Sequence, residues 1–336
     1  MTHDAIELPL VDLDDPHATD ALRHGLFDTG FFLLADHVIP RQLLDEVRSV
    51  TLEFMAKPVA DKERFVGPLR GWTAYAAENV ATAYGAEDAQ TGPDLCEKFS
   101  MGPFITDDMR RAEPDYYEDP ACQEFLPDNL FPEAEMERTW VDYYDRMQEL
   151  CFRLLDAIRV VMKLPQGVWD HYTRDAPSVL RFLAYPDNTG SHRMGAHFDD
   201  TLLTVLHQSV PTNGFAALQV QLPGSDEWRS VVPSDDVFVV NVGEALTFLS
   251  GGRIVATKHR VISPSRDQAE GSARTSLAHF FLPRWNAALT PTLPKANDGM
   301  RTSLDTPGLA EPDGSVIFHK VSRGQVDQMF GKDTKS

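Results

Sequence analysis

The sequence predicts a mixed α+β fold in which N-terminal helices support a double-stranded β-helix (jelly roll) core. Apolar residues recur at helical spacing in much of the first half, whereas short β-rich runs separated by turn residues follow Pro177. Strands that succeed one another without intervening helices favour an antiparallel sandwich or barrel. A hydrophobic fraction of 42% is sufficient to fill such a core.

The first elements are predicted to alternate between extended chain and helix. Residues 6–13 alternate loosely in polarity and suggest a short strand. A helix is expected over residues 17–29 and ends at Gly30, because glycine readily takes the left-handed conformation that closes many helices. Residues 31–34 (Phe-Phe-Leu-Leu) are predicted to form a buried strand, and Pro40 to begin a second helix.

A long helix is expected to complete the N-terminal half. Residues 67–132 are rich in Gly, Pro, Asp and Tyr and are predicted to be irregular. Residues 133–162 then return to helical spacing. One stripe of this helix, expected to face the core, consists of Trp140, Tyr144, Met147, Cys151 and Leu154.

Seven β-rich runs follow. They cover residues 179–184, 201–207, 216–221, 237–242, 246–249, 259–262 and 275–282. Turn dipeptides such as Asn213-Gly214 and Gly251-Gly252 separate them. We therefore expect one domain over residues 1–336, with a mainly helical or irregular part (1–176), a jelly-roll catalytic core (177–304) and a C-terminal covering arm (305–336).

The charge balance indicates which partners to expect. The chain has 51 acidic and 31 basic residues, which gives a formal net charge of -20. This charge disfavours nucleic acid and anionic membranes as partners. Such acidity suits a solvated surface, and it also suits a field that attracts a cationic small-molecule substrate. No apolar run approaches the roughly 18 residues of a membrane helix.

The cysteines and the first residues indicate a compartment. Cys96, Cys122 and Cys151 are odd in number and widely spaced, which is typical of reduced cysteines. The first residues show no basic region followed by an apolar stretch, so they do not resemble a secretory signal. A cytoplasmic enzyme is the expectation.

His197 and Asp199 are the first candidate metal ligands. Of the 11 histidines, only His197 is followed two positions later by an acid. If this segment is a strand, residues two apart project from the same face and can reach one point. Taken alone, the pair could equally be a hydrogen-bonded structural contact.

His259, at the start of another predicted strand, offers the third ligand. Two neutral imidazoles and one carboxylate form the facial triad of non-haem Fe(II) oxygenases, which leaves positions open for substrate and O2. Zinc is the competing metal, although a zinc site is normally tetrahedral with one open position. The predicted catalytic and metal-binding residues are thus His197, Asp199 and His259.

Arg274 and Ser276 form a candidate anion site on the strand that follows. The two share one strand face, a guanidinium binds a carboxylate in bidentate fashion, and the hydroxyl adds a donor. This pattern predicts an anchor for the distal carboxylate of 2-oxoglutarate. Tyr185 is predicted to add a phenol donor to the same group.

The chain resembles the isopenicillin N synthase-like family of Fe(II)/2-oxoglutarate oxygenases. Within that family it is similar to the penicillin ring-expanding group, the deacetoxycephalosporin C synthases. The resemblance rests on Asp28-Thr-Gly-Phe-Phe, Lys98-Phe-Ser-Met-Gly, Asp128-Asn-Leu-Phe-Pro, Glu137-Arg-Thr-Trp, Met194-Gly-Ala-His-Phe-Asp, Asn213-Gly-Phe-Ala-Ala-Leu-Gln, Gly251-Gly-Arg and Asp267-Gln-Ala-Glu-Gly-Ser-Ala-Arg-Thr-Ser.

The resemblance implies Fe(II) as cofactor and 2-oxoglutarate and O2 as co-substrates, with succinate and CO2 as products. It places the metal ligands at His197, Asp199 and His259 and the co-substrate anchor at Arg274 and Ser276. It leaves hydroxylation, ring closure, desaturation and epimerisation open as outcomes.

One departure bears on the substrate. The ring-expanding enzymes carry two arginines around a Phe on the strand before the metal motif, where this chain has Arg181 and Leu183. Losing a charge-assisted contact of about 1.5–3 kcal/mol would weaken carboxylate binding more than tenfold. We therefore expect a polar natural product, such as a basic aminocyclitol antibiotic precursor, with penicillin ring expansion as the alternative. Met194 and Asp200 are further predicted substrate contacts.

Two interpretations from other classes compete with the oxygenase. A zinc hydrolase would leave Arg274 and Ser276 without a role, and a non-catalytic jelly-roll metal-binding protein would not need the intact anchor. Apolar cavity walls are predicted at Phe198, Leu206 and Phe280, which could equally be plain barrel core.

Overall fold

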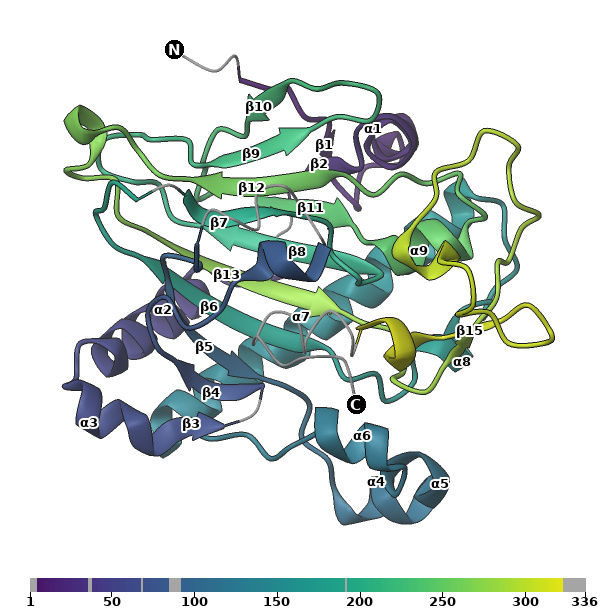
Figure 1. Cartoon of the computed structure of the whole chain (residues 1–336), viewed down its shortest axis with the longest axis horizontal. Coiled ribbons are helices and arrows are strands. Elements are labelled where there is room, and N and C mark those ends of the chain that lie inside the picture. Colours follow the sequence, from purple (N-terminus) through teal and green to yellow (C-terminus); the bar gives the residue numbers. More distant parts are fainter. Residues whose placement is uncertain (1–4, 36–37, 68, 85–91, 191, 323–336) are drawn as a thin grey trace.

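The fold combines two large β-sheets with helices that cover the outer face of one of them (Figure 1). A computed structural model describes residues 5–35, 38–67, 69–84, 92–190 and 192–322. The prediction of a mixed α and β fold is confirmed, and the structure has one large sheet.

The larger sheet has nine strands, in the order β1-β2-β11-β8-β13-β6-β5-β4-β3. Only β1 and β2 pair in parallel. In spatial order the strands are Leu10–Val11, Phe31–Leu34, Phe238–Val242, Leu203–Gln208, Arg274–Phe281, Val179–Tyr185, Glu97–Met101, Arg70–Thr73 and Val66–Gly67.

The smaller sheet has four strands in the order β10-β9-β12-β7. They are Trp228–Ser230, Leu218–Gln221, Lys258–Ile262 and His192–His197. The eight strands β6 to β13 are therefore shared out between the sheets, with β6, β8, β11 and β13 in the larger one and β7, β9, β10 and β12 in the smaller one. Because the chain crosses repeatedly from one sheet to the other, the functional side chains collect between them.

Helix α7 (Ala134–Val161) is the main support of the larger sheet. It packs against α2 (Arg41–Met55) and against β8 and β13, and Figure 1 shows it behind these strands. The indole of Trp140 donates a hydrogen bond to Thr51 of α2 at 2.9 Å. The predicted stripe of this helix is buried throughout, as expected.

Several predicted boundaries agree with the structure. The helix expected over residues 17–29 is an α-helix (α1, Ala18–His24) that continues as a π-helical turn (Gly25–Thr29) and ends at Gly30 with φ of 64°. The buried strand at residues 31–34 is β2, and the helix after Pro40 is α2. All three cysteines are buried and free of disulfides.

Two predictions were wrong. Residues 246–249 belong to a helix, α9 (Glu244–Leu249), rather than a strand; all six side chains are buried, so no periodicity distinguished the two. The span 67–132 is not irregular: it carries β3, β4, β5 and three short helices, α4 (Asp107–Ala112), α5 (Pro114–Tyr117) and α6 (Pro120–Phe125).

The C-terminal arm is more ordered than its composition suggested. A two-stranded sheet pairs β14 (Ala288–Leu289) with β15 (Val316–Ile317), and Phe318 and Val321 are buried in the core. The rest of the predicted arm, residues 323–336, lies outside the described residues. Within the described ranges, no helix is both long and apolar enough to span a bilayer.

Candidate active site

A cavity of about 200 Å³ lies between the two sheets. Its walls come from β6, β8, β11 and β13 of the larger sheet and from β7, β9 and β12 of the smaller one. The predicted ligands, the predicted anion anchor and the predicted substrate contacts all line this one cavity.

His197, Asp199 and His259 converge on one point of the cavity wall. One ligand atom from each lies within 4.8 Å of the others, and all three residues are buried. Nε2 of His197 lies 3.6 Å from Oδ1 of Asp199, and Nε2 of His259 lies 3.7 Å from the same oxygen. Strand pairing explains the convergence, because His197 of β7 and His259 of β12 are directly opposite each other.

The three side chains are held so that one possible ligand atom of each lies near those of the other two. Nδ1 of His197 lies 2.8 Å from the carbonyl of Gly195, and Nδ1 of His259 lies 3.2 Å from that of Thr257. A carbonyl can only accept, so each Nδ1 carries the proton and each Nε2 presents a lone pair. This orientation by a second hydrogen bond is typical of histidines that bind metals.

Two hydrogen bonds to Oδ2 fix the orientation of the Asp199 carboxylate. Oδ2 accepts hydrogen bonds from the hydroxyl of Thr204 at 2.6 Å and from the amide of Asn241 at 2.7 Å. Oδ1 is left facing the two imidazoles. Neither partner was predicted from the sequence, although Asn241 is a polar residue inside the buried strand Phe238–Val242.

The electrostatics match the protonation states that a metal requires. Burial, aided by the nearby charge of His259, lowers the pKa of His197 to about 4, so this imidazole is neutral at pH 7. Burial alone would raise the pKa of Asp199, but the two histidines and the hydrogen bonds from Thr204 and Asn241 hold it below its ordinary value. A neutral imidazole at His197 and a carboxylate at Asp199 fit a divalent transition metal.

The position of Asp199 differs in one respect from the prediction. Strand β7 ends at His197, so Asp199 lies in the loop after it rather than on the same strand face. The loop is anchored because the amide of Glu244, the first residue of α9, donates to the carbonyl of Asp199 at 2.8 Å. Helix α9 thus positions the ligand that the strand does not.

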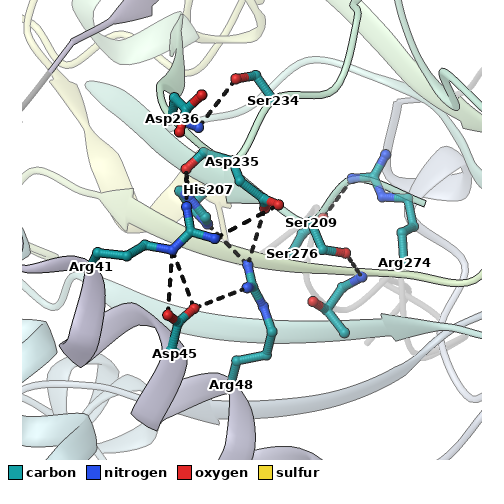
Figure 2. A network of polar contacts seen from close by, with 11 residues as sticks. Arg41, Asp45, Arg48, His207, Ser209, Ser234, Asp235, Asp236, Arg274 and Ser276 are labelled. Carbon is teal, nitrogen blue, oxygen red and sulfur yellow. Dashed lines mark hydrogen bonds and ion pairs between the residues drawn. The ribbon is translucent and has the colours of Figure 1, made fainter. Parts of the chain in front are cut away.

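Arg274 and Ser276 lie side by side on β13, as predicted (Figure 2). Nη2 of Arg274 donates to Oγ of Ser276 at 2.5 Å, and the guanidinium is packed over the ring of Tyr185 at 5.1 Å. Arg274 is buried, its Nε has no hydrogen-bond partner, and the described residues offer it no acid. A buried cation with an unused donor and an open cavity beside it fits the carboxylate of 2-oxoglutarate.

A polar network braces the strands next to this anchor. In Figure 2, Arg48 of α2 contacts both His207 of β8 and Asp235. The other ring nitrogen of His207 bonds to the carbonyl of Asp235 at 3.0 Å. Since β8 pairs with β13, these contacts connect α2 to the strand that presents Arg274.

Arg181 is engaged inside the protein. Its Nη1 bonds to Glu78 at 3.2 Å and its Nε to Ser100 at 3.0 Å. Lys98 also contacts Glu78, at 2.5 Å, and Asp94, at 3.0 Å. Burial opposes ionisation of Glu78, yet the charges of Lys98 and Arg181 lower its pKa to about 2. The guanidinium of Arg181 is therefore already paired within the protein. The sequence around Arg181 could not show this pairing.

The other predicted substrate contacts line the cavity, whereas the predicted cavity walls divide between two surfaces. Leu183, Met194, Asp200, Leu206 and Phe280 all line the cavity. The hydroxyl of Ser322 donates to Asp200, whose pKa burial raises to about 6. Phe198 does not line the cavity: it lies on a separate surface groove, because it points to the opposite side from its neighbours His197 and Asp199.

Comparison with known proteins identifies the family. The sequence profile of the 2OG-Fe(II) oxygenase superfamily matches residues 174–283, and that of the N-terminal region of non-haem dioxygenases in morphine synthesis matches residues 6–133. The chain is 30% identical to the 2-oxoglutarate-dependent dioxygenase citB of Monascus ruber, over 83% of this chain and 86% of that one. It is 26% identical to deacetoxycephalosporin C synthase of Amycolatopsis lactamdurans, over 86% and 87%.

Solved structures share the fold. The chain superposes on a full-length Neurospora crassa protein in complex with alpha-KG with a TM-score of 0.69 and 21% identity, covering 98% of both chains. For a putative 2OG-Fe(II) oxygenase family protein of Caulobacter crescentus the TM-score is 0.72 at 22% identity, covering 97% of this chain and 99% of that one. The sequence match and the site together establish that this chain belongs to the 2OG-Fe(II) oxygenase superfamily and is a dioxygenase that uses Fe(II), 2-oxoglutarate and O2.

Proposed function

We propose that the protein oxidises a C–H bond of a polar natural product, with Fe(II) held by His197, Asp199 and His259. One observation carries the proposal: three ligand atoms within 4.8 Å of one another line the same cavity as a buried arginine that has an unused donor. A metal site and an anion site in one cavity are what a metal-chelating dicarboxylate co-substrate requires.

The bound metal and co-substrate would supply the redox chemistry, in which oxidative decarboxylation of 2-oxoglutarate to succinate and CO2 accompanies oxidation of the substrate by O2. The protein's residues bind and orient. Arg274 and Ser276 bind the distal carboxylate of 2-oxoglutarate. The ring of Tyr185 packs against the guanidinium of Arg274 and stabilises its charge. Thr204 and Asn241 hold Asp199 so that one carboxylate oxygen stays directed at the metal position.

The alternation of β6 to β13 between two sheets supports the jelly-roll interpretation. Strands of both sheets contribute to one cavity, and the metal motif lies on facing strands of the smaller sheet. We further propose that residues 1–336 act as one catalytic domain, because α2 packs on α7, and α7 packs directly on the core strands β8 and β13.

The natural-product assignment draws support from the cavity and from the relatives. The cavity combines apolar walls with several charged side chains, so it suits a molecule that is partly polar. Relatives include a gibberellin 20 oxidase of Arabidopsis thaliana (27% identical, over 85% of this chain and 72% of that one). A basic aminocyclitol would need acids in the cavity, and of these Glu78 and Asp94 already pair with Lys98.

Two measurements test the proposed function. Oxygen-dependent conversion of 2-oxoglutarate to succinate, stimulated by substrate, is expected of an oxygenase and of neither rival class. The second measurement is a panel of natural products that contains penicillins, other carboxylates and basic aminocyclitols, scored for that stimulation. A protein that binds zinc and hydrolyses a substrate without consuming O2 would refute the proposal.

A further inference from the structure

Arg70 is a buried cation in the cavity wall that the metal and the co-substrate leave without a role. It lies at the start of β4 and is 2% exposed. Its Nη1 donates to the carbonyl of Leu69 at 2.8 Å and its Nη2 to that of Phe125 at 3.2 Å, while its buried Nε has no hydrogen-bond partner in the described part of the chain. The described residues offer it no carboxylate.

The other charges around it do not neutralise Arg70. Glu78 and Asp94 are bound by Lys98 and Arg181, so two acids face three cations in this part of the wall. Burial lowers the pKa of Arg70 to about 10, and the nearby charge of Arg181 acts in the same direction. Arg70 is still a cation at pH 7, and the described residues of this part of the wall carry one positive charge more than they carry negative charges.

The local backbone leaves room for the Arg70 guanidinium. A Cβ at Gly102 would lie 2.1 Å from Nη2 and 2.4 Å from Cζ of Arg70, so any larger residue there would displace the side chain. The backbone of Gly102 is itself fixed, because Asn129 bonds to its N–H at 2.8 Å and to its carbonyl at 2.9 Å. The position of Arg70 is therefore built into the fold.

This cation is distinct from the co-substrate anchor. Across the larger sheet, Gly71 pairs with Ser100, Ser100 with Arg181, and Arg181 with Ala278. Ala278 lies four residues beyond Arg274 on β13, which corresponds to about 13 Å along the strand. A carboxylate of 2-oxoglutarate bound at Arg274 is therefore not the group that contacts Arg70.

We propose that Arg70 binds an anionic group, most simply a carboxylate, of the primary substrate. The buried guanidinium, the surplus of cations over acids and the space provided by Gly102 carry this inference, which rests on the proposed oxygenase function. The assignment would compensate for Leu183: β6 carries no second arginine beside Arg181, and Arg70 would supply one from β4, which is separated from β6 by β5.

The surroundings also indicate the body of the substrate. The ring of Phe125 stacks on that of Trp285 with centroids 3.8 Å apart, and both residues line the cavity. Because Arg70 bonds to the backbone of Phe125, the aromatic pair lies close to the anion site. The preferred substrate class is therefore a carboxylate attached to an apolar ring or chain, rather than a polycation.

The test uses phenylacetate, phenylacetamide and phenethylamine as probes of equal size and different charge. Each is titrated calorimetrically, without oxygen, into the full chain loaded with Fe(II) and saturating 2-oxoglutarate, which occupies Arg274. We expect phenylacetate to bind at least about tenfold more tightly than the other two. Equal binding of the three probes, or no detectable binding of phenylacetate, would overturn the proposal.

Variants then assign the preference to a residue. Arg70→Gln should abolish the preference for the carboxylate, Arg70→Lys should retain part of it, and Glu78→Gln should increase it by removing an acid. Arg111→Gln, an exposed arginine on α4, is the charge-matched control. If Arg70→Gln does not fold, the opposite changes expected of Arg70→Lys and Glu78→Gln decide the matter. An unchanged preference in folded variants would refute the role of Arg70.

The affinity for 2-oxoglutarate, measured first in every variant, separates this inference from the proposed function. We expect it to be unchanged in Arg70→Gln. If the wild-type chain does not bind 2-oxoglutarate, the proposed function fails; if it does and shows no carboxylate preference, only the assignment of Arg70 fails.

Discussion

His197 and His259 face each other across β7 and β12, with ring centroids 4.3 Å apart. Strand pairing brings together two residues that are far apart in the sequence, and backbone carbonyls set the ring orientation of each. The edge of Phe31 packs against His259 at 5.5 Å and shields one side of the pair. Strand pairing and backbone hydrogen bonds thus bring the two imidazoles together.

The hydrogen bond from Asn241 to Asp199 should be important for metal affinity. Asn241→Ala removes one of the two donors to Oδ2, so we expect Fe(II) to bind about 10- to 100-fold more weakly while the protein stays folded. Competition with a chelator measures the affinity. Gln219→Ala, which removes a buried amide on β9 of the smaller sheet, is the control and should leave the affinity unchanged. Equal affinities in both variants would contradict the role of Asn241.

Arg274→Ala should weaken 2-oxoglutarate binding by roughly 10- to 150-fold, the equivalent of a charge-assisted contact of about 1.5–3 kcal/mol. Ser276→Ala should lose about 1 kcal/mol, or roughly fivefold. The dissociation constant is measured without oxygen, with Arg229→Ala of β10 as the surface control. A wild-type constant in Arg274→Ala would mean that another residue anchors the co-substrate.

The alternation of residues along predicted strands identified much of the site. Contacts between segments far apart in the sequence could not be predicted in this way. His197, His259, Arg274 and Ser276 could be found because each lies on or at the end of a strand with recognisable alternation. Arg70 could not be found, since its importance depends on β4, which joins the sheet within a span whose composition indicated irregular chain.

The fate of Arg181 illustrates the same limit of local patterns. Its side chain lines the cavity, but its guanidinium forms an ion pair with Glu78, which lies more than 100 residues earlier in the sequence. Helix α9 escaped prediction for a different reason: a fully buried helix has no polar face and therefore no helical periodicity.

Lys98 should be important for stability. It is 2% exposed and bonds to both Glu78 and Asp94, so Lys98→Met leaves buried carboxylates short of a partner. We expect a loss of about 3–5 kcal/mol in the free energy of unfolding, measured by urea denaturation. Lys57→Met breaks an exposed pair with Glu133 and should lose only about 0–1 kcal/mol. Similar losses in the two variants would show that the buried network is not stabilising.

His279 should make stability depend on pH. It is fully buried on β13, bonds to Gln148 at 2.9 Å, and burial lowers its pKa from 6.5 to about 3. Between these two values the unfolded chain binds a proton that the folded chain does not. The free energy of unfolding therefore falls as the pH falls from 6.5 toward 3, by up to about 1.4 kcal/mol per pH unit.

His279→Gln removes this contribution and should flatten the slope below pH 6.5 by that amount, while leaving the slope above pH 6.5 unchanged. Urea denaturation at a series of pH values measures it. His171→Gln, at an exposed position, is the matched control. Identical slopes in His279→Gln and the wild type would refute the assignment.

The most direct test of the central claim is an anaerobic titration of the metal-free protein with Fe(II) and then 2-oxoglutarate, followed by the visible absorption of the Fe(II)–2-oxoglutarate chelate. We expect the wild-type chain to develop the absorption at one Fe(II) per chain. His197→Ala, Asp199→Ala and His259→Ala should each fail to develop it while keeping a wild-type far-ultraviolet circular dichroism spectrum. Wild-type absorption and stoichiometry in any folded variant of these three would contradict the proposed site.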